Sequence, residues 1–231
     1  MLELTNVDAY YGNSRAIQNL SLDVKEGAFV AVLGRNGVGK TTLMRTIIGL
    51  MDRMTGSIRL DGMEIGGRRT HERALAGIGY VPQGRGILPR FTVRENLCLG
   101  LFANPKGRRG IDERVFDLFP MLKQQLHRRG GNLSGGQQQQ LAIARALLTD
   151  PKVILLDEPT EGIQPNIVEQ IEDVIVRLNR EHGITIVLVE QNVDFARRAA
   201  QAFVLMEKGR VAAKGSVADL TDDLVHRHMA V

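Results

Sequence analysis

The stretch that decides the fold of this chain is Gly34-Arg35-Asn36-Gly37-Val38-Gly39-Lys40-Thr41-Thr42, which fills every fixed position of the phosphate-loop pattern GxxxxGK[ST]. The apolar run 28–33 directly before it is typical of a strand buried on both faces of a parallel sheet. A helix expected from Lys40 onward would direct its positive end at the same place as the loop amides. Lys40 suits the outer phosphates of a nucleotide, and the hydroxyl of Thr41 suits Mg²⁺. The segment therefore predicts an α/β fold with a nucleoside triphosphate site.

A second apolar run, residues 153–156, ends in the adjacent carboxylates Asp157 and Glu158. Successive side chains of a strand point to opposite faces, so we expect the two carboxylates to do different work. Asp157 is suited to Mg²⁺, usually through water, and Glu158 is suited to the attacking water as a general base or orienting group. The alternative is an acidic helix cap or an ordinary surface pair.

Between these two segments lies Leu133-Ser134-Gly135-Gly136-Gln137. Its hydroxyl and backbone amides stand at the start of an expected helix, which makes an anion-binding helix N-terminus. Taken alone, the segment could equally be a serine N-cap with a glycine-rich entry. Its position makes it informative, because it begins 93 residues after Lys40 (133 − 40) and 20 residues before Val153 (153 − 133).

Composition limits the classes of protein to consider. The 231 residues suffice for a substantial core, and 30 Lys and Arg against 26 Asp and Glu leave a net charge of only +4. That balance favours neither nucleic-acid nor membrane binding. The single cysteine, Cys98, forms no internal disulfide and suits a reducing compartment. We find no run of about 20 apolar residues and no signal-peptide pattern at the N-terminus, so any work at a membrane is expected to go through a partner.

The chain is predicted to be a single domain, 1–231, with a mostly helical part at about 84–148 inserted in it. Residues 1 to about 65 alternate in short runs that predict antiparallel strands around the first nucleotide strand. Thr92 with Glu95 forms a capping-box pattern, and Asp112 is a candidate cap for a helix at 113–118. The remainder alternates between predicted strands at 153–156, 185–189 and 202–206 and predicted helices at 167–180 and 193–200.

Four basic pairs carry no interleaved aromatic residues, which favours solvated faces over nucleic-acid contacts, with anionic lipid headgroups as a further alternative. These pairs are Arg68-Arg69, Arg108-Arg109, Arg128-Arg129 and Arg197-Arg198. His226 and His228 resemble a metal pair only by their spacing.

Over essentially its whole length the chain resembles the nucleotide-binding subunit of an ATP-binding cassette importer. The resemblance implies an α/β P-loop NTPase cassette with a RecA-like parallel sheet core, an N-terminal antiparallel β subdomain and an inserted α-helical subdomain. It places Tyr11 against adenine, and Ala16 and Gly34 to Thr42 at the nucleotide. Gln83 would contact Mg²⁺ and the membrane subunit, and Leu133 to Gln137 would be the signature segment. Asp157 would be the carboxylate that binds Mg²⁺, and Glu158 would be the catalytic carboxylate.

The resemblance also implies an activity and partners. ATP with Mg²⁺ would be hydrolysed to ADP and phosphate. Two cassettes, identical or different, would form a sandwich in which the signature segment of one closes on the ATP held by the other. Closure would move two transmembrane permease subunits, one of which docks in a groove formed partly by residues 87–102. A periplasmic binding protein would act indirectly, nucleic acid would play no part, and the chain would sit peripherally on the cytoplasmic face of a bacterial inner membrane.

Two positions depart from the common family pattern. Gln191, in Val189-Glu190-Gln191-Asn192, stands where most members have a switch histidine. A glutamine can hydrogen-bond to a γ-phosphate but cannot carry a proton at neutral pH. Residues 161–164 read Glu-Gly-Ile-Gln where Ser-Ala-Leu-Asp is common. We therefore assign Gln191 to the catalytic group with Glu158 and expect an altered rate or coupling.

The same departures bear on the transported solute. The sequence VEQN is similar to the second ATPase of branched-chain amino acid importers, whereas the segments 127–131, 137–140 and 161–165 resemble the ATP-binding subunit of urea importers. We therefore expect urea import, with branched-chain amino acid or short-chain amide import as the alternative. Cassettes of DNA repair, chromosome organisation and translation are less favoured, because we find neither a sustained heptad repeat nor a second cassette, and the importer matches also argue against an exporter.

Overall fold

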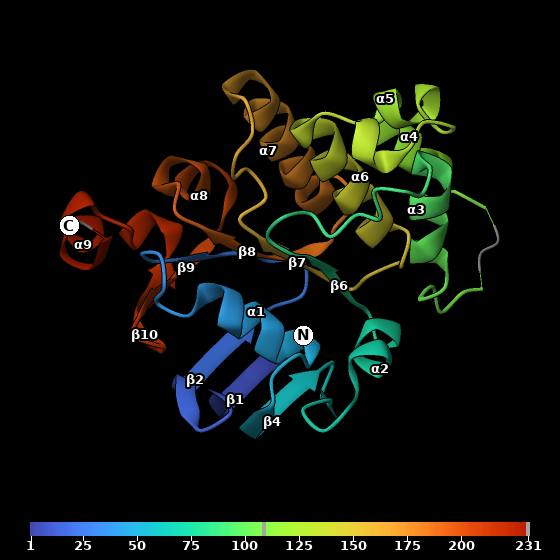
Figure 1. The fold of residues 1–231 in the computed structure, drawn as a ribbon. Helices are drawn as coiled ribbons and strands as arrows, with labels where there is room; N and C mark the ends of the chain where they lie inside the picture. Colours follow the sequence, from blue (N-terminus) through green and yellow to red (C-terminus); the bar gives the residue numbers. More distant parts are fainter. Residues whose placement is uncertain (108–109, 230–231) are drawn as a thin grey trace.

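The computed structural model describes residues 1–107 and 110–229, and within them the strands form two sheets (Figure 1). The four-stranded sheet has the order β2-β1-β4-β5 and is antiparallel. Its strands are β1 (Leu2–Tyr11), β2 (Ser14–Val24), β4 (Arg53–Leu60) and β5 (Met63–Glu64). The six-stranded sheet has the order β10-β9-β3-β8-β7-β6. Its strands are β3 (Phe29–Leu33), β6 (Ile78–Val81), β7 (Val153–Asp157), β8 (Thr185–Glu190), β9 (Ala202–Glu207) and β10 (Arg210–Ser216).

The helices divide between the two faces of the six-stranded sheet. In Figure 1, α1 (Lys40–Ile48) lies between the two sheets, and α3 to α8 lie on the opposite side of the larger sheet. The remaining helices are α2 (Thr70–Leu75), α3 (Val93–Leu101), α4 (Glu113–Leu118), α5 (Pro120–Gln124), α6 (Gly135–Leu147), α7 (Pro165–Arg180), α8 (Val193–Ala199) and α9 (Asp222–Met229).

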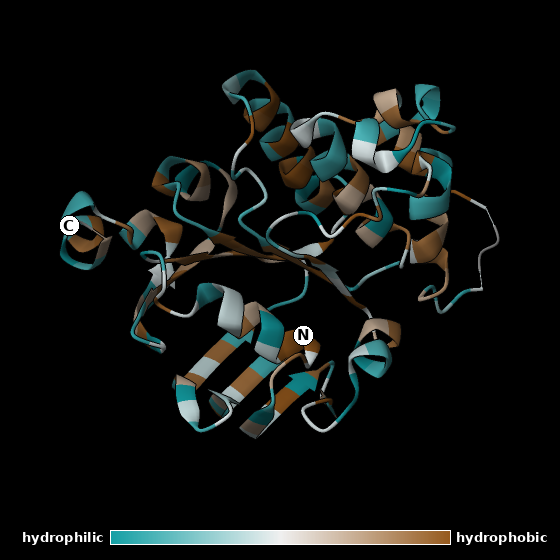
Figure 2. Ribbon diagram, viewed as in Figure 1, coloured by the Kyte–Doolittle hydropathy of each residue, from teal (hydrophilic) through white to brown (hydrophobic). Residues whose placement is uncertain are grey.

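The central strands contribute to two separate cores by strict alternation. In β3, the side chains of Phe29, Ala31 and Leu33 enter the core beneath α3 to α8, while Val30 and Val32 enter the core shared with α1 and the antiparallel sheet. Strands β7 and β8 divide in the same way. Figure 2 shows the resulting concentration of apolar residues along these strands and on the inner sides of the helices. Burial on both faces explains why the run 28–33 is apolar at every position.

Most predicted elements are confirmed, with ends shifted by one or two residues. The strands β3, β7 and β8 pair in parallel as expected, and β6, which was not predicted, pairs in parallel with β7. Thr92 and Glu95 form the predicted capping box of α3, and Asp112 caps α4. The helices α3 to α6 lie between β6 and β7 in the chain, where we predicted the helical insertion. The basic pair Arg108-Arg109 lies outside the described residues.

One expectation about the strands is wrong, and the last strand was missed. The antiparallel strands do not surround β3, because β3 pairs in parallel with β8 and β9 in the other sheet. Strand β10 was not predicted at all. It pairs antiparallel with β9 at the sheet edge, where its residues alternate between exposed and half-buried and so carry only a weak apolar pattern. Among residues 1–107 and 110–229, no helix combines the length and apolar composition needed to cross a bilayer.

The hairpin turn between β9 and β10 rests against β2 and the phosphate loop. Its central residues, Lys208 and Gly209, have φ values of +46° and +77°. The Gly209 N–H donates to the carbonyl oxygen of Val38 at 2.8 Å, and its own carbonyl accepts from the N–H of Gln18 at 2.8 Å. A Cβ on Gly209 would lie 2.1 Å from the carbonyl oxygen of Ala16. Only glycine permits both this conformation and this approach.

We expect Gly209→Ala to lower the free energy of unfolding by at least about 2 kcal/mol, because it adds a clash to a strained φ. The matched control is Gly62→Ala in the β4–β5 turn, where φ is +75° and an added Cβ meets nothing within 4 Å. That control bears the conformational strain alone and should cost about 1 kcal/mol. Urea unfolding of both purified variants measures the difference. Equal losses of unfolding free energy in the two variants would show that the close approach of Gly209 to Ala16 does not contribute to the cost.

Candidate functional site

The phosphate loop folds around the side chain of its own lysine. Lys40 Nζ donates to the carbonyl oxygens of Gly34 at 2.8 Å and Arg35 at 3.0 Å, and lies 3.3 Å from Glu158 Oε1. Only 4% of Lys40 is exposed. A cavity of about 300 Å³ opens at this point, lined by Asn36, Gly37, Gly39, Lys40, Thr41, Thr42, Gln83 and Glu158. The structure thus brings together most of the residues that the sequence assigned to nucleotide phosphates.

Two loop residues take other places. The carbonyl oxygen of Arg35 accepts a hydrogen bond from Lys40 Nζ, and the side chain of Arg35 is exposed. The side chain of Val38 packs against the core shared with α1. Both were predicted at the nucleotide, and their backbone positions in the loop remain compatible with that prediction.

Asp157 is a fully buried carboxylate beside the loop. Thr41 Oγ1 donates to it at 3.0 Å and the Tyr80 hydroxyl donates at 3.4 Å. Burial raises the pKa of Asp157, and the neighbouring Glu158 adds to the rise, while hydrogen bonds from Thr41, Tyr80 and the Gln83 backbone oppose it. Within the described residues Asp157 forms no ion pair. A carboxylate, a hydroxyl and an amide oxygen form a hard-oxygen ligand set, so Asp157, Thr41 and Gln83 fit a Mg²⁺ ion.

Glu158 is positioned differently from the expectation. We inferred from strand alternation that the two carboxylates face opposite sides, but β7 ends at Asp157 and Glu158 has a left-handed φ of +47°. The turn, rather than the pleat, aims its side chain at Lys40. The Glu158 N–H donates to the carbonyl oxygen of Val189 at 3.0 Å, which fixes this turn against β8. Inference from strand alternation failed because it holds only for extended residues.

Gln191 connects the phosphate loop to Glu158. Its Nε2 donates to Asn36 Oδ1 at 2.7 Å and to Glu158 Oε1 at 3.3 Å. The loop that carries Gln191 is held by Glu190, which is 5% exposed and accepts from Thr160 Oγ1 at 2.7 Å and from the Gln191 N–H at 3.0 Å. Sequence reasoning found Gln191 by its place after β8.

Three polar residues of the site were missed, namely Tyr80, Glu161 and Glu190. Glu161 Oε2 accepts from Gln83 Nε2 at 2.8 Å, so it touches a residue that was predicted. The available signal was position alone, since Tyr80 and Glu190 lie in strands that end at the cavity and Glu161 lies in the loop after another such strand. Their partners lie 30 or more residues away in the chain, so no local pattern reveals the contacts.

Tyr11 and Ala16 lie outside the residues that line this cavity. Tyr11 is 39% exposed, and the Arg45 guanidinium lies 5.5 Å from its ring centroid. The carbonyl oxygen of Ala16 would be 3.5 Å from a Cβ on Gly39, which places Ala16 beside the end of the phosphate loop. Contact of Tyr11 with adenine and of Ala16 with the nucleotide remains a prediction.

The signature segment caps helix α6. Ser134 Oγ accepts from the Gln137 N–H at 3.4 Å, and Gln137 Oε1 accepts from the Ser134 N–H at 3.0 Å. No residue of 133–137 is among the described residues that line the phosphate-loop cavity. Within one chain the segment is therefore separate from that cavity, as a site completed by a second cassette would require.

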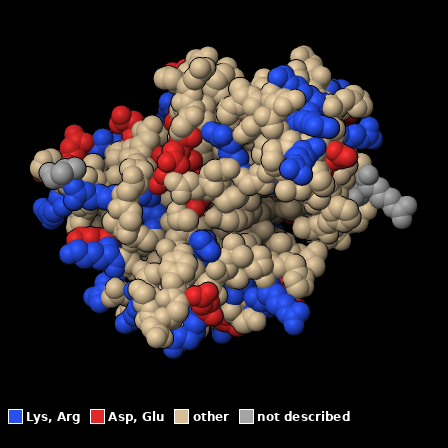
Figure 3. Space-filling model, in the orientation of Figure 1, with Lys and Arg blue, Asp and Glu red and all other residues tan. Residues whose placement is uncertain are grey.

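The described basic pairs are exposed or partly exposed, which agrees with the expectation of solvated faces. Figure 3 shows Lys and Arg spread over the visible face with acidic groups among them, rather than in one stripe. Arg128 and Arg129 are exposed, as expected. Arg197 and Arg198 form ion pairs with Asp222 and with the buried Glu172, and the Arg198 side chain stays 53% exposed.

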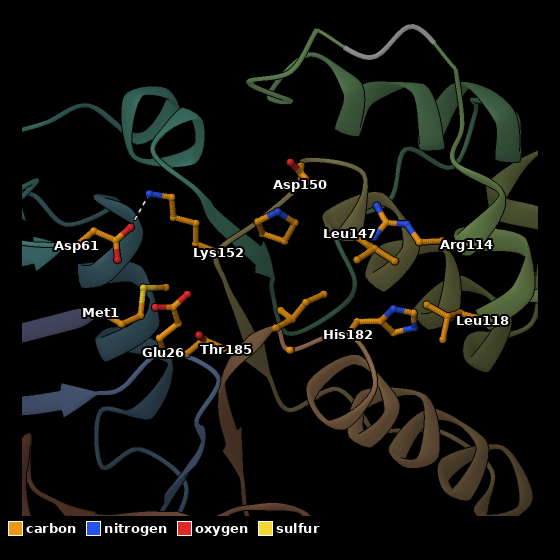
Figure 4. A pocket seen from close by; sticks show the side chains of 13 residues that line it. Met1, Glu26, Asp61, Arg114, Leu118, Leu147, Asp150, Lys152, His182 and Thr185 are labelled. Carbon is orange, nitrogen blue, oxygen red and sulfur yellow. Dashed lines mark hydrogen bonds and ion pairs between the residues drawn. The ribbon is translucent and has the colours of Figure 1, made fainter.

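A second cavity, of about 370 Å³, lies where β7 and β8 begin, at the opposite ends of these strands from the phosphate loop (Figure 4). Several of its charged side chains form ion pairs. Lys152 pairs with Asp61 at 2.5 Å, and Asp150 pairs with Lys106 at 2.5 Å.

Comparison with known proteins agrees with this geometry. Residues 17–161 match the family model described as ABC transporter. The chain is 42% identical over 212 residues to the high-affinity branched-chain amino acid transport ATP-binding protein BraG of Pseudomonas aeruginosa, covering 91% of each chain. It is 36% identical over 225 residues to the probable branched-chain amino acid transport ATP-binding protein LivF of Archaeoglobus fulgidus, covering 96% of this chain and 94% of that protein. A dimeric post-hydrolysis structure of the ATP-binding cassette MJ0796 with ADP and phosphate superposes with a TM-score of 0.80 at 29% identity, covering 94% of this chain and 99% of that one.

The raised pKa of Asp157 predicts how stability depends on pH in nucleotide-free protein with EDTA. Because its folded pKa lies above the unfolded one, the stability it contributes is present at low pH and lost as pH rises. We expect Asp157→Asn, which does not titrate, to gain stability relative to wild type between about pH 4 and about pH 7.

The control for this prediction is Asp8→Asn. A hydrogen bond from the Asn19 N–H, reinforced by Arg15, holds the pKa of Asp8 below its usual value. Its stabilisation is present at neutral pH and lost as pH falls, so this variant should be less stable than wild type at neutral pH and approach it in acid. Urea unfolding at the two pH values measures both. The same sign for both variants would contradict the assignment.

Proposed function

Because the chain belongs to the ABC transporter family of ATP-binding subunits, we propose that it powers solute import through partner membrane subunits, with a branched-chain amino acid as the solute. The chain is an ATPase coupled to transport, and its cassette binds ATP. The observation that carries the proposal is the cavity at which the phosphate loop, Gln83 and Glu158 converge, with Asp157 and Gln191 bound to residues that line it.

The roles of the residues follow from their contacts. The loop amides and Lys40 would bind the phosphates, and Lys40 would exchange its two carbonyl partners for phosphate oxygens. Glu158, 9% exposed, is the group able to take a proton from an attacking water or to orient it. Gln191 donates to Glu158 and Asn36 and therefore holds that carboxylate in place, but an amide cannot itself relay a proton. Mg²⁺, when bound by Thr41, Asp157 and Gln83, would neutralise charge on the phosphates.

We propose that a second cassette, identical or different, completes the site. The support is that residues 133–137 lie away from the cavity of their own chain while presenting a capped helix N-terminus. Such a terminus is suited to the phosphates of a nucleotide held by a partner.

The membrane subunits are proposed to dock in a groove of about 330 Å³ between α2, β6, α3 and α6. Leu99 and Gly100 line it, and both fall within the stretch 87–102 that we assigned to such a groove. Arg145 lines the same groove and donates to the carbonyl oxygen of Gly86 at 2.8 Å, three residues after Gln83. Movement of a membrane subunit in this groove would therefore displace the backbone close to Gln83 and the ATP site. A peripheral position at the cytoplasmic side of a membrane follows from this proposal.

The choice of solute rests on similarity alone, since no residue of this chain need touch it. The relatives BraG and LivF favour branched-chain amino acids over our expectation of urea. The second candidate remains urea, supported by the segments 127–131, 137–140 and 161–165.

Replacing the proposed base should abolish turnover but not binding. We expect Glu158→Gln to lower ATP hydrolysis in the assembled transporter by about 100-fold or more. ATP affinity should stay near the wild-type value, because glutamine preserves the shape. Phosphate release and nucleotide binding measure the two effects, with Glu169→Gln on the exposed face of α7 as the control. Hydrolysis close to wild type would remove Glu158 from the catalytic role.

Uptake identifies the solute. In a strain lacking this chain, we expect uptake of labelled leucine to be lost and uptake of labelled urea to persist. The wild-type gene should restore leucine uptake and Glu158→Gln should not. Loss of urea uptake alone would overturn the proposal in favour of the urea importer.

A further inference from the structure

The amide of Gln83 is held by a carboxylate from the loop that follows the catalytic residue. Gln83 Nε2 donates to Glu161 Oε2 at 2.8 Å. The backbone of Gln83 lies close enough to Asp157 to help to lower the pKa of that carboxyl group, against the effect of burial. Gln83 also lines the phosphate-loop cavity.

Glu161 is itself held close to the catalytic turn. Its N–H donates to the carbonyl oxygen of Glu158 at 3.2 Å, which closes the turn Glu158-Pro159-Thr160-Glu161. Its neighbour Thr160 donates to the buried Glu190 at 2.7 Å. The carboxylate therefore projects from a restrained backbone, although the side chain itself is exposed.

The chemistry of the two groups fixes the orientation of the amide. An ionised carboxylate only accepts hydrogen bonds, and the NH₂ end of a glutamine only donates. Gln83 must therefore turn its nitrogen to Glu161, which leaves Oε1 as the opposite, free end. Among the described residues, none donates a hydrogen bond to Gln83 Oε1. That oxygen is also the only side-chain atom of Gln83 that can bind a cation.

We propose that Glu161 is a positioning residue that orients the amide of Gln83 so that Oε1, and not Nε2, is presented to the Mg²⁺ held by Thr41 and Asp157. The inference rests on the proposed function, because it deepens the role of Gln83 in that site. It gives a purpose to an acidic residue at a position where the common family pattern has serine. Partners that orient a metal ligand typically change metal affinity by about 10–100-fold when removed.

The negative charge of Glu161 would also raise Mg²⁺ affinity by attraction alone, without orienting the amide of Gln83. The experiment must therefore separate orientation from charge. Isothermal titration of the purified chain with the non-hydrolysable analogue AMP-PNP, in Mg²⁺ and in EDTA, gives the factor by which Mg²⁺ tightens binding. We expect Glu161→Ala to lower this factor by about tenfold and to leave the affinity in EDTA unchanged.

Two further variants and one control decide the mechanism. In a Gln83→Ala background, Glu161→Ala should have no further effect, because no amide remains to be oriented. Glu161→Gln keeps an acceptor oxygen without the charge and should retain most of the Mg²⁺ effect. Glu169→Ala removes an exposed acidic side chain from the start of α7 and should behave as wild type.

The inference is overturned if Glu161→Ala leaves the Mg²⁺ factor unchanged, or if it lowers that factor equally with and without Gln83, which would indicate charge alone. Failure of the proposed function would give a different binding result. In that case the wild-type chain itself would bind AMP-PNP no better with Mg²⁺ than with EDTA.

Discussion

The arrangement of the site depends on one constraint, which is that the central strands are buried on both faces. Strands β3, β8, β7 and β6 are adjacent and parallel, and their alternating side chains fill two cores. Unpaired polar groups inside either core would be costly, so chemistry is confined to the strand ends. Because parallel strands end at the same edge, the four loops that follow them meet there. Asn36, Gln83, Glu158 and Gln191 reach one cavity or its rim for this reason.

Within that edge, the two carboxylates differ in their electrostatic surroundings. Glu158 has a cationic partner, because Lys40 Nζ lies 3.3 Å from it. Asp157 has hydrogen-bond donors, and burial raises its pKa. A buried carboxylate with hydroxyl donors and no cation among the described residues is the group whose charge a metal ion would compensate best. Burial that makes the ionised form of Asp157 unfavourable without a cation would strengthen its attraction to a bound Mg²⁺.

Much of the fold was predictable, because the patterns concerned are local. The buried strands β3, β7 and β8 appear as unbroken apolar runs, and the caps of α3, α4 and α6 appear as spaced polar residues. The features that were missed or placed wrongly each depended on a contact between distant segments. Strand β10 exists because β9 offers it an edge. The side chain of Glu158 does not follow the alternation of β7, because its N–H donates a hydrogen bond to Val189 in β8.

The sequence by itself determined that this chain has a phosphate loop, two carboxylates after a buried strand and a signature segment, because each is a fixed arrangement of residues within one short stretch. It thereby determined the family and the identity of most groups at the nucleotide. Only the tertiary structure decided how those groups are oriented. Glu161 meets Gln83 across 78 positions of the chain, and Gln191 meets Asn36 across 155. Such contacts leave no periodic trace in the sequence, because they depend on strand order in the sheet rather than on spacing along the chain.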